Sequence, residues 1–355
     1  MNPILADKLQ LWGFEDDFII FSDGSFGFGL EISQLDIDCL SDEAVNALAE
    51  RTSQFLNGLP VSSDIQFVKT VVSGSNDLLQ GHLQLAQTSQ NDIAKVLTQE
   101  RVKRLHDLEA GNLLPKHHLY VFVRRKSQGP LFQKPKFFSR PKLFEKMGES
   151  ILTREIVTTQ SLRDHVARGL STLGIQSKTL NADTLANIIY RQWNPSRPTE
   201  LSGYDSEDIR SSLLFSDVAI SEKGFVIGDT HYRIVSLKIL PERTHAAMSR
   251  AFLDLPLNSS LFLTINVPDQ QREVESLQTQ RRLAFSMARG KREGVSDIES
   301  ESKFQDLETL LSEMIAQGEK VFHVSLNVVL QSQGTEELND QVAHTLLKFR
   351  ELAGV

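Results

Sequence analysis

The sequence has little cysteine and no long apolar run. Its only cysteine, Cys39, cannot form an intramolecular disulfide or a multi-thiolate zinc site, and this scarcity fits a reducing compartment. No apolar run approaches the roughly 20 residues that a membrane-spanning helix needs. The first residues also lack the basic-then-apolar order of a secretory signal. We therefore expect no transmembrane segment and only peripheral contact with any membrane.

Motifs for nucleotide and metal chemistry are also absent. No stretch matches G-x-x-x-x-G-K-[ST], the loop that surrounds a triphosphate and its magnesium ion. The glycine-rich stretches 24–29 and 224–230 lack its lysine and lie in strand-like sequence. The nine histidines show no H-E-x-x-H pattern, and no G-x-S-x-G elbow is present. The sequence thus predicts no catalytic, cofactor-binding or metal-binding residue, and an enzyme with a scattered site is the remaining catalytic alternative.

Charge is distributed unevenly along the sequence. The formal net charge of −8 argues against a generally basic surface that would coat nucleic acid. Between Lys116 and Lys146, however, nine lysines and arginines stand against Glu145 alone, so this segment carries +8 and the remainder carries −16. A second asymmetry follows later, where a stretch rich in arginine up to residue 292 precedes an acidic stretch over 293–319. Charge pairing between subunits is one interpretation of that second pattern.

Apolar periodicity and capping residues predict a mixture of strands and helices. Two β-prone runs around Asp23-Gly24 predict a hairpin, because Asp-Gly suits a turn with positive φ at both central residues. Ser41 and Asn181 are placed as helix N-caps. Further helices are expected over 92–110, 143–173, 270–289, 297–317 and 336–352, and further strands over 65–72, 118–125, 217–220, 224–227, 232–240, 260–267 and 321–330.

This alternation predicts an α+β fold built from layered lobes of mixed, partly antiparallel sheet with packed helices. We place an N-terminal α+β lobe at residues 1–126 and a basic, proline-containing arm at 127–141. A second α+β lobe with long helices is placed at 142–355.

The basic segment has several interpretations. The cations that we expect to meet a partner are Arg124, Arg125, Lys126, Lys134, Lys136, Arg140 and Lys142. Three phenylalanines are interleaved among them, so the segment is suited to binding nucleic-acid phosphates by charge and stacking bases on aromatic rings. Anionic lipid headgroups or an acidic protein would be attracted by the same charges. Without any partner, it would be a solvated loop that its phenylalanines anchor to their own lobe.

Three stretches of sequence carry a family resemblance. They are 21–27 leading to 40–43, 239–241 leading to 260–267, and 318–326. In content and order they resemble the N-terminal region of the TraC-type, VirB-like ATPases, which energise type IV secretion and plasmid conjugation. The likeness spans most of the chain.

The resemblance implies a role in docking rather than turnover. In that family such a region precedes a RecA-like motor with a P-loop, a Walker B acid and an arginine finger, usually in hexamers. ATP and magnesium are therefore expected only in a motor domain, and a chain stopping at Val355 is expected to be a truncated product, a split gene or an isolated domain. The implied location is the cytoplasmic side of the inner membrane, as a peripheral protein.

The implied partners are other type IV secretion components, the motor domain and other ATPase subunits, with a homo-oligomer in the full-length context. The expected function is thus a non-catalytic assembly and docking domain of a conjugative ATPase that anchors it to inner-membrane components. The alternative is a nucleic-acid-binding module that uses residues 124–142, with DNA as the partner.

Overall fold

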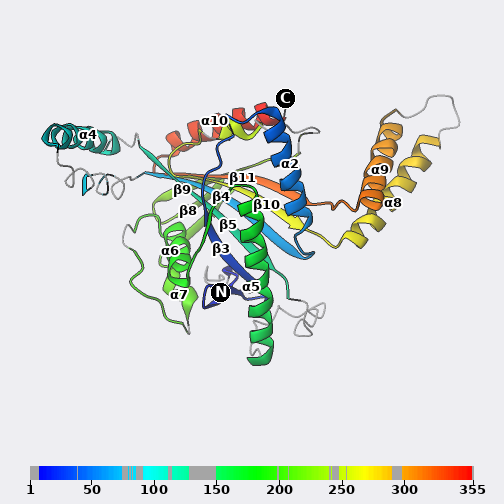
Figure 1. The fold of residues 1–355 in the computed structure, drawn as a ribbon, viewed down its shortest axis with the longest axis horizontal. Helices are drawn as coiled ribbons and strands as arrows, with labels where there is room; N and C mark the ends of the chain where they lie inside the picture. Colours follow the sequence, from blue (N-terminus) through cyan, green and yellow to red (C-terminus); the bar gives the residue numbers. More distant parts are fainter. Residues whose placement is uncertain are drawn as a thin grey trace.

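One antiparallel sheet flanked by helices dominates the protein (Figure 1). The computed structural model describes residues 8–37, 39–73, 79, 81, 83–84, 91–110, 114–127, 149–197, 200–206, 208–239, 241, 248–252, 254–289 and 298–353. The strands are β1 (Leu11–Glu15), β2 (Phe18–Phe21), β3 (Phe26–Ile32), β4 (Ser63–Ser73), β5 (Pro115–Arg125), β6 (Ser177–Thr179), β7 (Val218–Ser221), β8 (Gly224–Ile227), β9 (Thr230–Ser236), β10 (Ser259–Val267) and β11 (His323–Ser332). The helices are α2 (Asp42–Asn57), α4 (Asp92–Ala110), α5 (Glu149–Thr172), α6 (Ala182–Trp193), α7 (Ile209–Leu213), α8 (Gln270–Arg289), α9 (Ile298–Gln317), α10 (Thr335–Ala353) and the 3-10 helix η1 (Met248–Phe252). The predicted α+β class is confirmed.

The strand order places distant parts of the sequence side by side. It runs β1-β2-β3-β5-β4-β10-β11-β9-β8-β7, and β6 pairs with β3 beside this path. At the centre, β4 pairs with β10, with Val68 opposite Phe262. Strands from both sides of the basic segment therefore share one sheet. The division into lobes at 127–141 stays a prediction, and nearly all of that arm lies outside the described residues.

The predicted hairpin around Asp23-Gly24 is confirmed as β2 and β3, but its turn type differs. Gly24 has φ of 75°, in the left-handed region that glycine enters without strain, whereas Asp23 is not among the described residues with positive φ. The Asp23 carboxylate instead accepts hydrogen bonds from the Ser25 amide (3.0 Å) and hydroxyl (2.6 Å). The Gly24 amide donates to the Phe21 carbonyl (2.8 Å) and the Phe21 amide donates to the Ser25 carbonyl (2.9 Å), so the loop has three residues, of which only the last needs a positive φ.

Both predicted helix caps are confirmed. The Ser41 hydroxyl accepts from the Ala44 amide at the start of α2, and the Asn181 side chain accepts from the Thr184 amide at the start of α6. Each side chain satisfies one of the amides that a first helical turn leaves unpaired.

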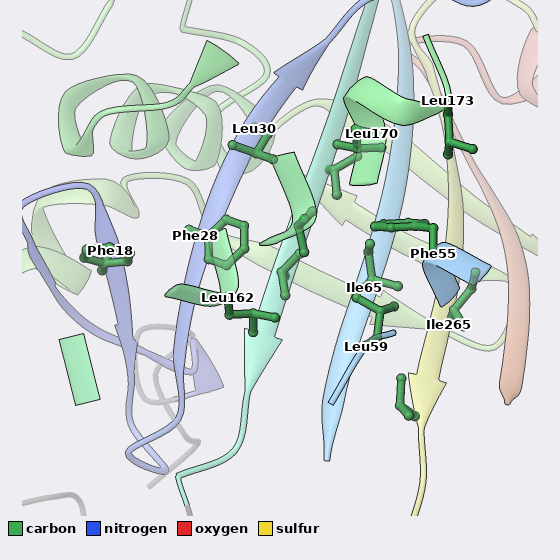
Figure 2. Packing of buried hydrophobic residues seen from close by; sticks show 14 residues of the cluster. Phe18, Phe28, Leu30, Phe55, Leu59, Ile65, Leu162, Leu170, Leu173 and Ile265 are labelled. Carbon is green, nitrogen blue, oxygen red and sulfur yellow. The ribbon is translucent and has the colours of Figure 1, made fainter. Parts of the chain in front are cut away.

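The largest core cluster lies where α2 and α5 cover one face of the sheet. In Figure 2, Phe55 of α2 and Leu170 of α5 lie beside Ile65 of β4 and Ile265 of β10. A second cluster lies on the same face of the sheet. Val71 of this cluster and Ile65 of the first are an even number of residues apart along β4, so their side chains point to the same side. There α10 and η1 pack on the strands around β11.

A third cluster lies on the opposite face. Tyr120 and Phe122 of β5 belong to it, whereas the alternate residues Val121 and Val123 belong to the first cluster. This third cluster contains Leu185 of α6, so α6 and its neighbour α7 cover the sheet near β1 to β3.

Two helical insertions leave opposite ends of the central strands. Between β4 and β5, whose ends pair at Ser73 and Pro115, the chain forms α4. Between β10 and β11, which pair as far as Asn266 and His323, it forms α8 and α9. Because β10 runs antiparallel to β4 and ends opposite Ser63, the insertions point away from each other. Figure 1 shows α4 at the far left and the pair α8–α9 at the far right.

Candidate interaction surfaces

The structure places Arg124 inside an intramolecular network on β5. Its guanidinium donates to Asp23 Oδ2 (2.6 Å), Ser25 Oγ (2.7 Å) and Gln10 Oε1 (3.1 Å). The same guanidinium lies 4.5 Å from the centre of the Phe21 ring. Burial by itself would raise the pKa of Asp23, but the hydrogen bonds from Ser25 and the charge of Arg124 outweigh it and hold that pKa below its ordinary value. Arg124 thus fastens β5 to the β2–β3 turn.

Arg125 points to the other face of the sheet and pairs with Glu155 of α5. Adjacent strand residues face opposite ways, which separates the two arginines. Both side chains of this pair are buried, at 12% exposure for Arg125 and 6% for Glu155. The exposed Arg154 also approaches Glu155, at 3.5 Å. Arg125 thus joins β5 to α5 in the core region rather than presenting its charge to solvent.

Lys126 is the exposed member of the three cations that the structure describes. Its backbone amide donates to the Ser62 carbonyl (3.0 Å), and its side chain is exposed. The remaining predicted contact residues, Lys134, Lys136, Arg140 and Lys142, lie outside the described residues. Binding of nucleic acid or an anionic surface by this segment therefore stays a prediction.

A groove of about 400 Å³ opens beside Lys126, between the end of α2, the end of β5 and α5. Its lining residues are Gly58, Pro60, Val61, Arg125, Lys126, Thr158, Ser161, Leu162 and His165. The Thr158 and Ser161 hydroxyls donate to carbonyls of their own helix, Arg154 and Val157. The groove therefore combines apolar lining residues, among them Val61 and Leu162, with one exposed cation, Lys126.

A second, open cavity of about 470 Å³ lies between the β1–β2 turn, α5 and the start of α6. Arg163 lines it, 3.5 Å from Asp17 and with its guanidinium 4.9 Å from the centre of the Phe18 ring. Two further carboxylates, those of Asp16 and Asp183, line it. Among the residues that the structure describes, no group of three or more histidine, cysteine, aspartate or glutamate side chains is arranged to hold a metal ion.

Helix α4 carries an exposed apolar row. Ile93, Val96 and Leu97 are exposed by 71%, 59% and 66%, whereas Val102 is 3% exposed. Ile93 and Val102 are nine positions apart, about two and a half helical turns, so their side chains leave opposite sides of the helix. The helix over 92–110 is as predicted, but its apolar residues lie on two faces rather than on one. The wheel position of Val102 was the signal in the sequence that could have shown it.

Helices α8 and α9 form an antiparallel pair that makes most of its contacts within itself. On α9, Leu307, Leu311 and Met314 are buried at the alternating spacing of three and four residues that is typical of a coiled-coil seam. Two contacts across the pair set its register. They are the Phe285–Phe304 ring contact, with centroids 5.5 Å apart, and the Arg281–Glu308 ion pair at 3.9 Å.

The base of this pair is held by hydrogen bonds to the segment that precedes β11 and to the end of α2. The Gln270 side chain donates to the Val321 carbonyl (3.1 Å) and accepts from the Val321 amide (2.9 Å). Lys320 donates through Nζ to the Leu59 carbonyl (2.7 Å) and through its amide to Asn57 Oδ1 (3.2 Å). These bonds fix where the two helices leave the body of the protein. Within the described ranges, no helix is both long and apolar enough to cross a membrane.

Comparison with known families gives one assignment. The model of a family described as TraC protein matches residues 14–352. A comparison with curated proteins finds no significant match.

Proposed function

The chain belongs to the TraC family, which acts in type IV secretion and conjugation, and on that premise we propose that it is an assembly and docking domain. In this role it holds a conjugative ATPase to other secretion components at the inner membrane. The observation that carries the proposal is the exposed apolar row on α4, at the end of an arm that leaves the sheet.

Exposed side chains of this kind are suited to a partner helix or groove. Ile93, Val96 and Leu97 follow the i, i+3, i+4 spacing with which a helix presents one apolar stripe. An isolated exposed apolar residue is ordinary on a protein surface, but three adjacent ones on a helix are typical of an interaction site. Hydrophobic burial against a partner would stabilise such a complex by about 25 cal/mol per Å² of apolar surface removed from water.

The experiment replaces the three exposed side chains of this row with serine and measures the frequency of conjugative transfer. In donor cells, the triple variant Ile93→Ser, Val96→Ser, Leu97→Ser should lower conjugation frequency at least about tenfold, the equivalent of about 1.4 kcal/mol in one binding step. The chain should also no longer co-purify with the other secretion components of the inner membrane. Circular dichroism should stay unchanged, because the three side chains contribute little to the core.

The matched control is Val157→Ser, which removes another apolar side chain that is 57% exposed on a helix, here on α5. It should leave transfer and co-purification at the level of the unchanged protein. Normal transfer and co-purification in the α4 triple variant would refute docking through this row.

A separate measurement addresses turnover. Because the sequence contains no phosphate-binding loop, the purified chain should show no magnesium-dependent hydrolysis of ATP above the background of a heat-denatured sample. Saturable hydrolysis that follows the protein through purification would contradict the non-catalytic role.

A further inference from the structure

The groove beside Lys126 has two walls of different kinds. One wall is a single stripe of α5, because its members follow the spacing i, i+3, i+4, i+7 with which a helix presents one side. They are Thr158, Ser161, Leu162 and His165. The facing wall consists of residues from the connection between α2 and β4 and from the end of β5.

The length of the α5 stripe limits what the groove can hold. Its first and last members are seven residues apart, which at 1.5 Å per residue makes the stripe about 10 Å long. An extended chain advances about 3.3 Å per residue. The stripe therefore matches about three residues of an extended peptide. The groove's volume of about 400 Å³ is also within the range of sites that bind small ligands.

The two ends of the groove differ in charge. At one end, the ion pair of Arg125 with Glu155 holds β5 against α5, and the neighbouring Lys126 is exposed. At the other end, Nε2 of His165 lies 3.1 Å from the position that a Cβ atom on Gly58 would take. Glu155 balances the charge of Arg125, so the exposed positive charge is that of Lys126. None of the described residues that line the groove carries a carboxylate.

The remaining lining is mainly apolar. Val61 is 38% exposed, and the buried Leu162 lines the groove from α5. The hydroxyls of Thr158 and Ser161 already donate to carbonyls of their own helix. A ligand of this groove therefore meets apolar side chains next to one exposed ammonium group.

We propose that the groove binds a short extended segment of a partner protein, in which an acidic and an apolar side chain stand two residues apart. Alternate side chains of an extended chain point to the same side, so both enter the groove. The carboxylate pairs with Lys126, and the apolar side chain packs against Val61 and Leu162. This inference does not rest on the docking role of α4.

The charge of the groove favours a peptide over a nucleic acid or a lipid surface. A phosphate backbone is bound by several cations, each of which neutralises one phosphate. An anionic membrane likewise attracts clusters of lysine and arginine. The groove presents a single exposed cation beside apolar side chains, and one carboxylate near one apolar residue matches that set.

Three capped peptides test the ligand, namely Gly-Glu-Ser-Leu-Gly, Gly-Lys-Ser-Leu-Gly and Gly-Glu-Ser-Ser-Gly. At millimolar concentrations the first should shift the amide resonances of Val61, Lys126 and Leu162 in the full chain, and the shifts should saturate. The second and third should each bind at least about fivefold more weakly, because each lacks one of the two contacts. A fourth peptide, with glutamate and leucine exchanged, covers the opposite chain direction.

Variants of the protein test the groove. Lys126→Glu should weaken binding of the first peptide at least about fivefold and favour the lysine peptide instead, because the charge at that end is reversed. Ser161→Trp should abolish binding of both, because its ring system fills the groove. The matched controls are Lys178→Glu, at an exposed lysine of β6, and Ser171→Trp, at an exposed position on another side of α5. Both controls should bind the first peptide as the unchanged protein does.

Three results would overturn the proposal. They are the absence of saturable shifts with either peptide that carries both glutamate and leucine, an unchanged affinity in Lys126→Glu, and displacement of the peptide by a single-stranded oligonucleotide or by phosphatidylglycerol vesicles. Circular dichroism of each variant establishes that the fold is retained. The α4 triple variant should bind the first peptide normally, so failure of the docking role and failure of this inference give different results.

Discussion

The buried ion pair between Arg125 and Glu155 joins the end of β5 to the middle of α5. Two charges lose hydration when they are buried, and their mutual attraction roughly offsets that loss, so such a pair contributes little net stability. Removing only one partner destabilises the folded protein strongly, because the other charge then stays buried without an opposite charge beside it. Arg154, which approaches the same carboxylate from an exposed position, has water as an alternative partner.

We therefore expect Glu155→Ala to lower the free energy of unfolding by about 3–5 kcal/mol. Arg154→Ala, the matched control, should change it by less than about 0.5 kcal/mol. The double variant Arg125→Met, Glu155→Leu should be milder than Glu155→Ala, because neither charge remains. Urea unfolding followed by circular dichroism measures all three, and equal effects of Glu155→Ala and Arg154→Ala would contradict the interpretation.

Asp23 makes the stability of the folded protein depend on pH under acidic conditions. Its pKa in the folded protein lies below the ordinary value, so its stabilising contribution is complete above the unfolded pKa of about 3.9 and is lost as the pH falls through the folded pKa. Because the side chain is 48% exposed, solvent screening limits this contribution to about 1 kcal/mol. Asp23→Asn should therefore melt below the unchanged protein at neutral pH, and the difference should shrink below about pH 4. A difference that grows on acidification would refute this.

The same contacts affect how nucleic-acid binding should be tested. Glutamate at position 124 or 125 would stand beside Asp23 or Glu155 and damage the fold, so lost binding would have two explanations. Lys126→Glu avoids both carboxylates. If the basic segment binds DNA, this variant should weaken binding and reduce its dependence on salt by about one unit of logarithmic slope.

At the scale of elements, the contact between α2 and α5 depends on a close approach. A Cβ atom at Gly169 of α5 would lie 2.2 Å from Cδ2 of Phe55 on α2. Alanine would gain up to about 1 kcal/mol of helix propensity over glycine. Crowding in a packed core costs about 1–3 kcal/mol, and Phe55 is 6% exposed and has little room to move. The free-energy cost of crowding therefore exceeds the gain in helix propensity.

Gly169→Ala should consequently destabilise the protein by about 1 kcal/mol or more. In a Phe55→Ala background the same change should be neutral or stabilising, because the Cδ2 and Cε2 atoms that a Cβ at position 169 would meet are gone. Ser171→Ala, at an exposed position of the same helix, is the control and should be near neutral. Thermal unfolding of the four proteins in a double-mutant cycle gives the coupling, and an absent coupling would contradict the contact.

At the scale of the whole molecule, the sheet forms the body of the protein and the arms are additions to it. The α8–α9 pair has its own seam of Leu307, Leu311 and Met314. Its base is held by Gln270 and Val321, whose hydrogen bonds do not need the outer helices. The body should therefore fold without the arm.

We expect a variant in which a short Gly-Ser linker replaces residues 272–317 to keep a cooperative thermal transition. Its melting temperature should stay within a few degrees of the full protein, since the core clusters on the sheet do not include α8 or α9. Far-ultraviolet circular dichroism should lose signal in proportion to the helical residues removed. A non-cooperative melt would show that the arm belongs to the folding unit.

Much of the secondary structure could be predicted from local patterns. The helix over 270–289 was placed at its observed bounds, and Ser41 and Asn181 were placed at observed caps. Such signals are local, because apolar spacing and capping depend on residues within a few turns of one another. The short strands β1 and β6 were missed, since their few residues carry no clear alternation of their own.

The candidate surfaces could be predicted only in part. The positive charge of the segment from residue 124 onward was visible, but the engagement of Arg124 and Arg125 was not, because Asp23 and Glu155 are about 100 and 30 residues away. The exposure of Ile93 could not be predicted from the sequence for a related reason. An apolar residue on a helix is buried only if another element covers that side, and periodicity does not say which element is present.

By itself, the sequence determined where most helices and strands form, where they are capped, and which charges and motifs they carry, because these depend on short-range geometry. Tertiary structure alone decided that β4 pairs with β10, about 190 residues away, and that two arms leave opposite ends of the resulting sheet. Register between distant strands depends on how well both faces of the whole sheet can be buried, and that balance exists only once the chain has folded.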